Sequence, residues 1–392
     1  MNEPLSVAAC LPEDRDRAVL IGRAWVPAVE GPAVVCVRGD DVYDLSRVAA
    51  TTSAFFELDD PVAVLRDATS LPALAPLADI LANSAWNQRD NGVPWFLAPC
   101  DLQAIKASGV TFVASMLERV IEEQARGDPA KAQSVRDAIV GVIGDNLASV
   151  RPGSPEAMRL KDVLIEQRVW SQYLEVGIGA DAEIFTKSQP MSAVGLGAEI
   201  GIHPRSEWNN PEPEIVLVVN SRGRSVGATL GNDVNLRDFE GRSALLLGKA
   251  KDNNASCAIG PLIRVFDEAF SIDDIRACEL AMRVDGPEGF ALQGASSMAM
   301  ISRDPLDLVG QAIGANHQYP DGVMLFLGTM FAPTQDRLGP GQGFTHVVGD
   351  IVTVATPKLG ALVNRVNRTD RIPPWTFGTG ALMKNLARRG LL

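Results

Sequence analysis

The sequence predicts an α+β protein, and three observations support this class. Residues 18–47 alternate short apolar pieces with turns, and the Gly39-Asp40-Asp41 turn between two apolar runs is typical of a hairpin. Residues 115–174 carry the apolar periodicity and end signals of helices. After Gly177 the chain changes to short, glycine-bounded segments rich in β-branched residues, which favour strands.

Two domains are expected, because 392 residues exceed the size of one typical core. A small β-containing domain is predicted over residues 1–102, where proline-punctuated text follows the hairpin. A β-rich domain of a size sufficient for catalysis is predicted over residues 103–392. No internal repeat and no glycine-rich phosphate loop occurs, so nucleotide-binding folds are not indicated.

A helical segment interrupts the second domain near its start. "AIKASGVTF" is typical of a buried strand, and "SMLERVIEEQARG" follows it as an amphipathic helix. A second helix is predicted at about 131–142. A third is predicted to begin at Ser154-Pro155-Glu156 and to reach about Leu174, since proline is favoured in the first helical position. The later strands are predicted at "EIVLVV", "SVGATLGNDV", "GFALQG", "GVMLFLGT" and "DIVTVAT".

Composition excludes some classes of protein. A net charge of −12 and an isoelectric point near 4.9 argue against nucleic acid and anionic membrane surfaces as partners. The five cysteines are scattered without a CxxC pair, which favours reduced thiols over a zinc site. No apolar run has the length of a membrane span, and the first residues lack the pattern of a secretory signal. A cytoplasmic location is therefore expected.

An unusual triplet, Glu212-Pro213-Glu214, stands at the start of an apolar strand. Carboxylates two residues apart on an extended chain point the same way and repel each other unless a cation, a basic side chain or solvent lies between them. Asp233 and Lys251 follow in "GNDVNLRD" and "GKAKDNNASC", and Glu183 precedes them in "AEIF". Oxygen ligands without cysteine or paired histidines favour Mg²⁺, Mn²⁺ or Ca²⁺ over zinc. Taken alone, the triplet is more often a solvated strand end.

The order of these segments resembles the C-terminal domain of the fumarylacetoacetate hydrolase family over residues 103–392. That family has a strand with the pattern K-x-G-x-N-Y-x-x-H-x-x-E, then an FxK segment, a metal-binding E-x-E, the motif NDVTARD, a catalytic lysine and late glycine-rich elements. The matching segments are Lys106–Glu118, "FTKSQP", Glu212 with Glu214, "NDVNLRD", Lys251 in "AKDNNASC", "LGTMFAP" and Gly349-Asp350.

The resemblance implies a mixed β-roll as the fold of the catalytic domain, with the helical segment as an insertion. It also implies a Mg²⁺-like ion (Mn²⁺ or Ca²⁺ being alternatives) on Glu212, Glu214 and Asp233, and a small 2-oxo acid as substrate. Lys251 would act at this ion with a lowered pKa, as a base or as a partner of the enolate. Homodimers or homotetramers are implied as well. The matched segments suggest substrate binding by Ser115, Lys187, Thr329 and Ser256.

One departure from the family pattern bears on the reaction. Family hydrolases carry a His-x-x-Glu pair that activates water, whereas "SMLE" places Ser115 and Glu118 at those positions. The three histidines, His203, His317 and His346, all lie elsewhere and are expected to be structural. A serine cannot replace an imidazole as general base near neutral pH. Ser115 itself is expected to be a helix N-cap.

Three functions follow as hypotheses. The first is a metal-dependent hydro-lyase that dehydrates a 2-keto-3-deoxy-pentonate (xylonate or arabinonate skeleton) to 2-oxoglutarate semialdehyde, with Lys251, Glu183 and Glu118 as catalytic residues. A glutamate such as Glu183 resembles one found in the family members that dehydrate these sugar acids. The second is a hydrolase that cleaves a carbon–carbon bond in an acylpyruvate or 2,4-diketo acid. The third is a metal-stabilised protein without turnover, which would not need Lys251. The helical segment is expected to cover the site as a lid or to serve as a packing element.

Overall fold

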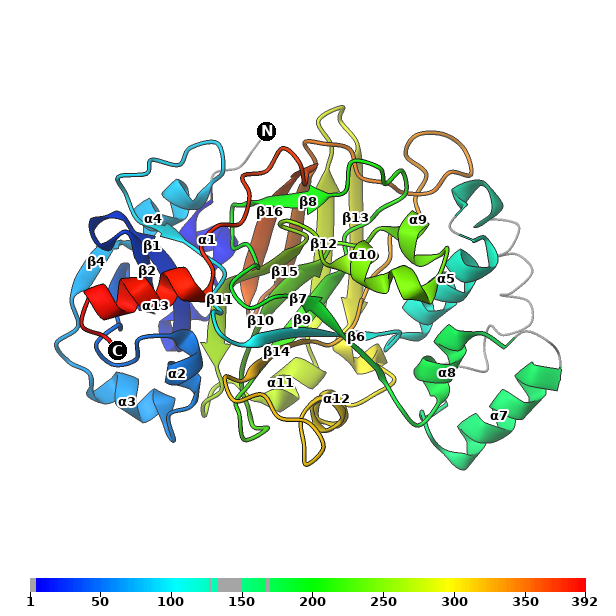
Figure 1. Cartoon of the computed structure of the whole chain (residues 1–392), viewed down its shortest axis with the longest axis horizontal. Helices are drawn as coiled ribbons and strands as arrows, with labels where there is room; N and C mark the ends of the chain where they lie inside the picture. Colours follow the sequence, from blue (N-terminus) through cyan, green and yellow to red (C-terminus); the bar gives the residue numbers. More distant parts are fainter. Residues whose placement is uncertain (1–4, 127, 133–149, 167–169) are drawn as a thin grey trace.

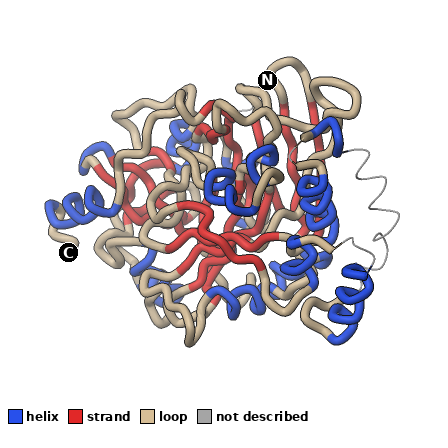
Figure 2. Tube along the Cα trace, turned by 45° about the vertical axis from the view of Figure 1, so that its right-hand side comes forward, coloured by secondary structure: helices blue, strands red, loops and turns tan. Residues whose placement is uncertain are grey.

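The computed structural model describes residues 5–126, 128–132, 150–166 and 170–392. It is an α+β structure built on two β-sheets, with helices around their edges and faces (Figures 1 and 2). The predicted fold class is therefore confirmed at this level. None of the helices in these ranges is long and apolar enough to cross a membrane. All five cysteines are buried and form no disulfide.

The larger sheet has the strand order β4-β3-β2-β1-β11-β10-β9-β14-β6-β7, and β5 pairs with β1 beside this path. Neighbouring strands are antiparallel except for the parallel pair of β14 and β6. The strands are β1 Leu20–Val26, β2 Gly31–Arg38, β3 Asp41–Asp44, β4 Ala73–Pro76, β5 Trp95–Phe96, β6 Ala104–Gly109, β7 Glu183–Ser188, β9 Pro213–Val219, β10 Ser225–Asp233, β11 Cys257–Val265 and β14 Val323–Phe326. The predicted hairpin is formed by β2 and β3.

The smaller sheet has the order β13-β12-β15-β16-β8 and lies against the larger one (Figure 1). Its strands are β8 Glu199–Ile202, β12 Glu279–Asp285, β13 Ala291–Ser297, β15 Ile351–Thr356 and β16 Gly360–Arg368. Strand β9 shows how the core is divided. Ile215 and Leu217 pack with side chains of the smaller sheet, while Val216 and Val218 pack into a second core on the opposite face. A strand covered on both faces explains the continuous apolar run "EIVLVV".

The N-terminal strands are part of the larger sheet. Strand β1 pairs with β11 through Leu20 with Arg264 and Ile21 with Ile263. At the other end of the chain, α13 (Thr379–Arg388) lies beside β2, where the Asn385 amide donates to the carbonyl of Val29 over 2.8 Å (Figure 1). The N-terminal strands thus share hydrogen bonds with the rest of the chain, and the treatment of residues 1–102 as a separate domain stays a prediction.

The helical segment between β6 and β7 contains α5 (Val113–Gln124), α7 (Pro155–Glu166) and α8 (Gln172–Ile178). The first and third predicted helices are found, and the Ser154 hydroxyl accepts the Ala157 N–H at the start of α7 over 3.1 Å. The second predicted helix lies almost wholly outside the described residues. The three helices share an apolar cluster that includes Met116, Val120 and Leu174.

The other helices of the described residues are short, and most of them connect strands. They are α1 Val7–Cys10, α2 Thr52–Phe56, α3 Pro61–Asp67, α4 Leu77–Ser84, α9 Arg237–Glu240, α10 Leu247–Lys251, α11 Ile272–Arg276 and α12 Pro305–Ala312. Helices α9 and α10 follow β10 directly, and α5 packs against α9. This packing brings the helical segment close to the ends of β9 and β10.

Candidate active site

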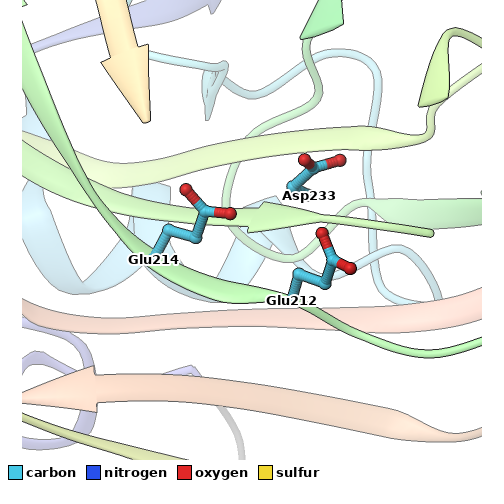
Figure 3. A group of neighbouring side chains, drawn as sticks. All are labelled: Glu212, Glu214 and Asp233. Carbon is cyan, nitrogen blue, oxygen red and sulfur yellow. The ribbon is translucent and has the colours of Figure 1, made fainter. Parts of the chain in front are cut away.

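Glu212, Glu214 and Asp233 come together where β9 begins and β10 ends (Figure 3). The two strands are antiparallel neighbours with Glu214 opposite Gly231, and the Asp233 N–H donates to the Glu212 carbonyl over 2.9 Å. One carboxylate oxygen from each residue lies within 4.8 Å of the others. The sequence prediction that E-x-E and the later aspartate converge is confirmed in geometry.

Each of the three residues is about 1% exposed, and burial of neighbouring carboxylates disfavours their ionised forms. Burial, together with the nearby charges of Asp233 and Glu212, raises the pKa of Glu214 well above its usual value. Two donors partly compensate: the Gly328 N–H at 2.7 Å and the Thr329 hydroxyl at 3.3 Å. Thr329, predicted to bind substrate, therefore contacts a proposed metal ligand.

Lys251, at the end of α10, holds two of the three carboxylates. Its Nζ lies 2.5 Å from Glu212 Oε2 and 3.1 Å from Asp233 Oδ2. Burial lowers the pKa of this ammonium, but Asp233 and then Glu212 more than offset burial, so the pKa is raised. The prediction that Lys251 has a lowered pKa is therefore wrong for the protein without a metal ion. In this state the side chain is a fixed positive charge.

Lys187 and Ser256 support Lys251 and its neighbours. Lys187 Nζ, fully buried in β7, lies 2.9 Å from Asp233 Oδ1 and also donates to the Lys251 carbonyl. The Ser256 hydroxyl lies 2.7 Å from the same carbonyl. Both residues were predicted to bind substrate, and that role stays a prediction. The contacts show that they hold the backbone at the end of α10.

Glu183 is the first residue of β7 and pairs with Gly109 of β6. Its carboxylate lies over that glycine, because a Cβ placed on Gly109 would stand 1.8 Å from Glu183 Oε2. Burial raises the pKa of Glu183 to about 7, and the charge of Glu240 adds to this effect, although Arg119 and Lys251 oppose it. A carboxyl group with this pKa can both give and accept a proton near neutral pH.

Ser115 and Glu118 lie on α5. The helix begins at Val113 with Phe112 as its N-cap, so Ser115 is in the first turn, and the expectation that it is the cap residue is wrong. Glu118 is half-buried. Their expected catalytic and substrate-binding roles stay predictions.

None of the three histidines belongs to the carboxylate group. His346 is buried and pairs with Asp350 at 2.9 Å, and His203 contacts the ring of Phe239. His317 is exposed and contacts Tyr319. The three contacts agree with the structural roles expected for them.

Sequence reasoning missed the residue of α5 that reaches the site, Arg119. Its guanidinium pairs with Glu212, with Glu122 at 2.6 Å and with Glu240 at 3.5 Å. Arg119 and Glu122 stand three residues apart on a helix, which is the spacing of an ordinary solvated ion pair. In the sequence, Arg119 and Glu122 stand among the apolar residues Met116, Val120 and Ile121, which the structure buries. This position was the feature that could have indicated a buried ion pair.

The charges of the site fit a divalent cation. Five buried carboxylates and the half-buried Glu183 face four buried cations, so with every carboxylate ionised the group would carry two more negative than positive charges. One Mg²⁺-class ion would balance this excess, and three carboxylate oxygens are the ligands that such ions prefer. The carboxylates are Glu122, Glu183, Glu212, Glu214, Asp233 and Glu240, and the cations are Arg119, Lys187, Arg237 and Lys251.

Comparison with known proteins gives the family of this chain. The model described as "Fumarylacetoacetate (FAA) hydrolase C-terminal" matches residues 171–367, which include all three carboxylates and Lys251. The chain belongs to the fumarylacetoacetate hydrolase family.

Two curated relatives of this chain carry dehydratase names. The chain is 30% identical over 190 residues to "2-dehydro-3-deoxy-D-arabinonate dehydratase" of Saccharolobus solfataricus, a match that covers 48% of this chain and 60% of that protein. It is 30% identical over 201 residues to "Probable 2-keto-3-deoxyxylonate dehydratase" of Haloferax volcanii, covering 51% of this chain and 65% of the relative. The matches thus span less than two thirds of either relative.

Solved structures share the fold over most of the chain. A "2-keto-3-deoxy-D-arabinonate dehydratase apo form" superposes with a TM-score of 0.59 at 20% identity, covering 89% of this chain and 99% of the other. The same enzyme "complexed with magnesium and 2,5-dioxopentanoate" gives a TM-score of 0.58 at 20% identity with the same coverage. At this level of identity the likeness establishes the fold of the fumarylacetoacetate hydrolase family.

Proposed function

We propose that this protein is a divalent-metal-dependent dehydratase of a 2-keto-3-deoxy sugar acid. The substrate is a 2-keto-3-deoxy-pentonate with the xylonate or arabinonate skeleton, and the product is 2-oxoglutarate semialdehyde (2,5-dioxopentanoate). The observation that carries this proposal is the buried group of Glu212, Glu214 and Asp233 beside Lys251 and Glu183. The names of the two relatives support the choice of substrate class.

Glu212, Glu214 and Asp233 would hold Mg²⁺ (or Mn²⁺ or Ca²⁺), and their donor set suits a hard cation. Such an ion, when bound, would withdraw electrons from the 2-oxo acid and so acidify its C3 protons. Thr329 and the Gly328 N–H orient Glu214 for this role, and Lys187 orients Asp233.

Glu183 is the group that we propose moves the proton. Its pKa of about 7 leaves a substantial ionised fraction at neutral pH, which can take a proton from C3. The protonated carboxyl can then give a proton to the hydroxyl that leaves C4, so that water departs and one C3–H and one C4–O bond break. Glu118 of α5 is proposed to assist this departure. This elimination leaves a double bond between C3 and C4. Loss of one proton from C5 and return of one proton to C3 move the double bond to C4 and C5, and the resulting enol gains a proton at C4 as its hydroxyl loses one, which gives the aldehyde.

Lys251 is proposed to stabilise the enolate. The raised pKa of its ammonium makes it a poor base, while its position on Glu212 and Asp233 keeps a positive charge beside the developing negative charge. Burial excludes water from these contacts and strengthens them.

Carbon–carbon hydrolysis is the second candidate, since membership of the family supports it. A hydrolase must activate an attacking water molecule, and among the described residues no histidine lies in the carboxylate group. Dehydration requires no such water. We therefore favour dehydration.

One experiment separates the two reactions. A panel of 2-keto-3-deoxy sugar acids and acylpyruvates is incubated with the Mg²⁺-loaded protein, and products are identified by mass spectrometry. The proposal expects loss of 18 mass units from a pentonate, as the loss of one water requires, and no cleavage of acylpyruvates. Efficient acylpyruvate cleavage without dehydration would show a hydrolase instead. Size-exclusion chromatography with light scattering would test the proposed dimer or tetramer.

A further inference from the structure

Arg119 connects the helical segment to the carboxylate group. It extends from α5, which packs against α9 (Figure 1), and its guanidinium pairs with Glu212 and with two buried carboxylates outside the proposed ligand set, Glu122 and Glu240. Burial alone would lower the pKa of Arg119, but the charges of Glu122 and Glu212 outweigh burial and raise this pKa above its usual value. The side chain is therefore permanently charged.

The contact of Arg119 with Glu212 is not what a site built only to hold a cation requires. Lys251 already donates to Oε2 of Glu212, and Arg119 pairs with Oε1, so one proposed ligand lies between two cations. Burial raises the pKa of Glu212, but Arg119 and then Lys251 outweigh it and hold the pKa at about 2. Each added positive charge also repels an incoming metal ion. A second cation is useful, however, if the site must also bind an anion.

Arg119 is held in place by Glu122 of the same helix, which also pairs with Arg237 of α9. Glu122 lies between Arg119 Nη1 at 2.6 Å and Arg237 Nε at 3.1 Å. Arg237 is itself anchored, because its Nε donates to the Asn210 side chain at 2.9 Å and its Nη1 to the Pro333 carbonyl at 3.2 Å. Such a chain of buried ion pairs fixes the direction in which the guanidinium points.

We propose that Arg119 binds the anionic 2-oxo acid substrate, and that Glu122, held by Arg237, is its positioning residue. This rests on the proposed function, because it takes the substrate to be a 2-oxo acid bound at the carboxylate group. A guanidinium has no acceptor atom and does not lose its proton, so Arg119 stabilises negative charge without activating water. In this proposal α5 contributes to substrate binding through Arg119, a residue that the family pattern did not indicate.

The test uses oxalate, a mimic of the planar enolate of a 2-oxo acid, and needs no turnover. Calorimetry measures Mg²⁺ binding to the metal-free protein and oxalate binding to the Mg²⁺-loaded protein for wild type, Arg119→Met and Glu122→Gln. The control is Arg159→Met, which removes an exposed arginine of α7 that pairs with Glu156. Arg119→Met is expected to lower the affinity for oxalate about 10- to 100-fold, which is the effect of losing a charge-assisted hydrogen bond. Its Mg²⁺ affinity is expected to stay equal or to rise, because a repelling charge is gone.

Glu122→Gln is expected to weaken oxalate by a smaller factor, about threefold to tenfold, because the guanidinium remains but loses its fixed direction. Oxalate affinity within twofold of wild type in Arg119→Met would overturn the proposal, as would a parallel loss of oxalate and Mg²⁺ affinity, which indicates a structural role. If Arg119→Met does not fold, Arg119→Lys replaces it. That variant keeps the positive charge but loses the two parallel donors of the guanidinium, so its affinity for oxalate should fall while its affinity for Mg²⁺ is unchanged. An unchanged affinity for oxalate would again overturn the proposal. Absence of dehydratase turnover with these binding results intact would count against the proposed reaction only.

Discussion

The ammonium of Lys251 lies 2.5 Å from Oε2 of Glu212, so the proposed catalytic cation and a proposed metal ligand are in direct contact. Their contact joins α10 to the start of β9 in the buried part of the molecule. It makes Lys251 part of the charge balance of the site, and a divalent cation that binds Glu212 must share this carboxylate with it.

The first prediction concerns this lysine. Lys251→Met keeps most of the volume but removes the charge beside the enolate, so turnover should fall by about a hundredfold or more. Oxalate binding should weaken less than turnover does, because Lys251 acts mainly on the charge that develops during reaction. Steady-state kinetics and calorimetry measure the two quantities. Lys249→Met, on the exposed side of the same helix, is the matched control and should leave both unchanged. Equal losses in kcat for the two variants would contradict the role of Lys251.

The second prediction concerns the metal ligands. Glu214→Gln removes a charge from three crowded carboxylates, and activity should fall by about a hundredfold or more. Without metal this variant should be at least as stable as wild type, since burial and its neighbours disfavour an ionised Glu214. Added Mg²⁺ should raise the melting temperature of wild type and change that of the variant little.

Thermal unfolding with and without EDTA measures this effect. Glu279→Gln, at an exposed position of β12, is the control and should respond to Mg²⁺ as wild type does. Full activity after exhaustive chelation would refute the metal site.

The third prediction is a pH dependence that originates in Glu183. The pKa of this carboxyl is raised to about 7, and the ionised form is the proposed base. kcat/KM should therefore increase as the pH rises towards 7 and level off above it, with the midpoint at or below 7, because a bound cation favours the ionised form. Glu183→Gln should lose this limb together with most of the activity. A profile that keeps the same limb in the variant would assign the titration to another group.

The fourth prediction concerns the proposed lid. If α5 and α8 cover the site, oxalate with Mg²⁺ should slow amide hydrogen exchange in peptides from 113–124 and 172–178. Peptides from β3, near the end of the larger sheet opposite to β6 and β7, provide the internal control. Unchanged exchange in α5 and α8 would favour a static packing element.

The sequence predicted the local elements because they depend on short-range patterns, and its resemblance to the family indicated the three carboxylates that the structure brings together. The strand "EIVLVV" and the helix "SMLERVIEEQ" are found as β9 and α5, and the spacing of Glu212 and Glu214 places both carboxylates on one side. Other features depend on contacts between distant segments. The pairing of β1 with β11 joins the N-terminal strands to the larger sheet, and no local pattern near Leu20 or Arg264 indicates it.

The charge state of the site was harder to predict for the same reason. Whether Lys251 has a raised or a lowered pKa depends on its distances to Glu212 and Asp233, which sequence spacing does not give. Arg119 and Glu122 have the spacing of a surface pair, and only the packing of α5 against α9 buries them. Buried ion pairs of this kind look like solvated ones until the fold is known.

The most direct measurement of the central claim is proton NMR of a 2-keto-3-deoxy-pentonate incubated in D₂O with the Mg²⁺-loaded protein. Dehydration predicts loss of the C4 carbinol signal, appearance of the aldehyde of 2,5-dioxopentanoate with its hydrate, and deuterium in the C3 methylene. The Glu214→Gln variant and the EDTA-treated protein should leave the substrate unchanged. Conversion to pyruvate and glycolaldehyde would mean that the bond between C3 and C4 is cleaved instead, and that result would contradict the account.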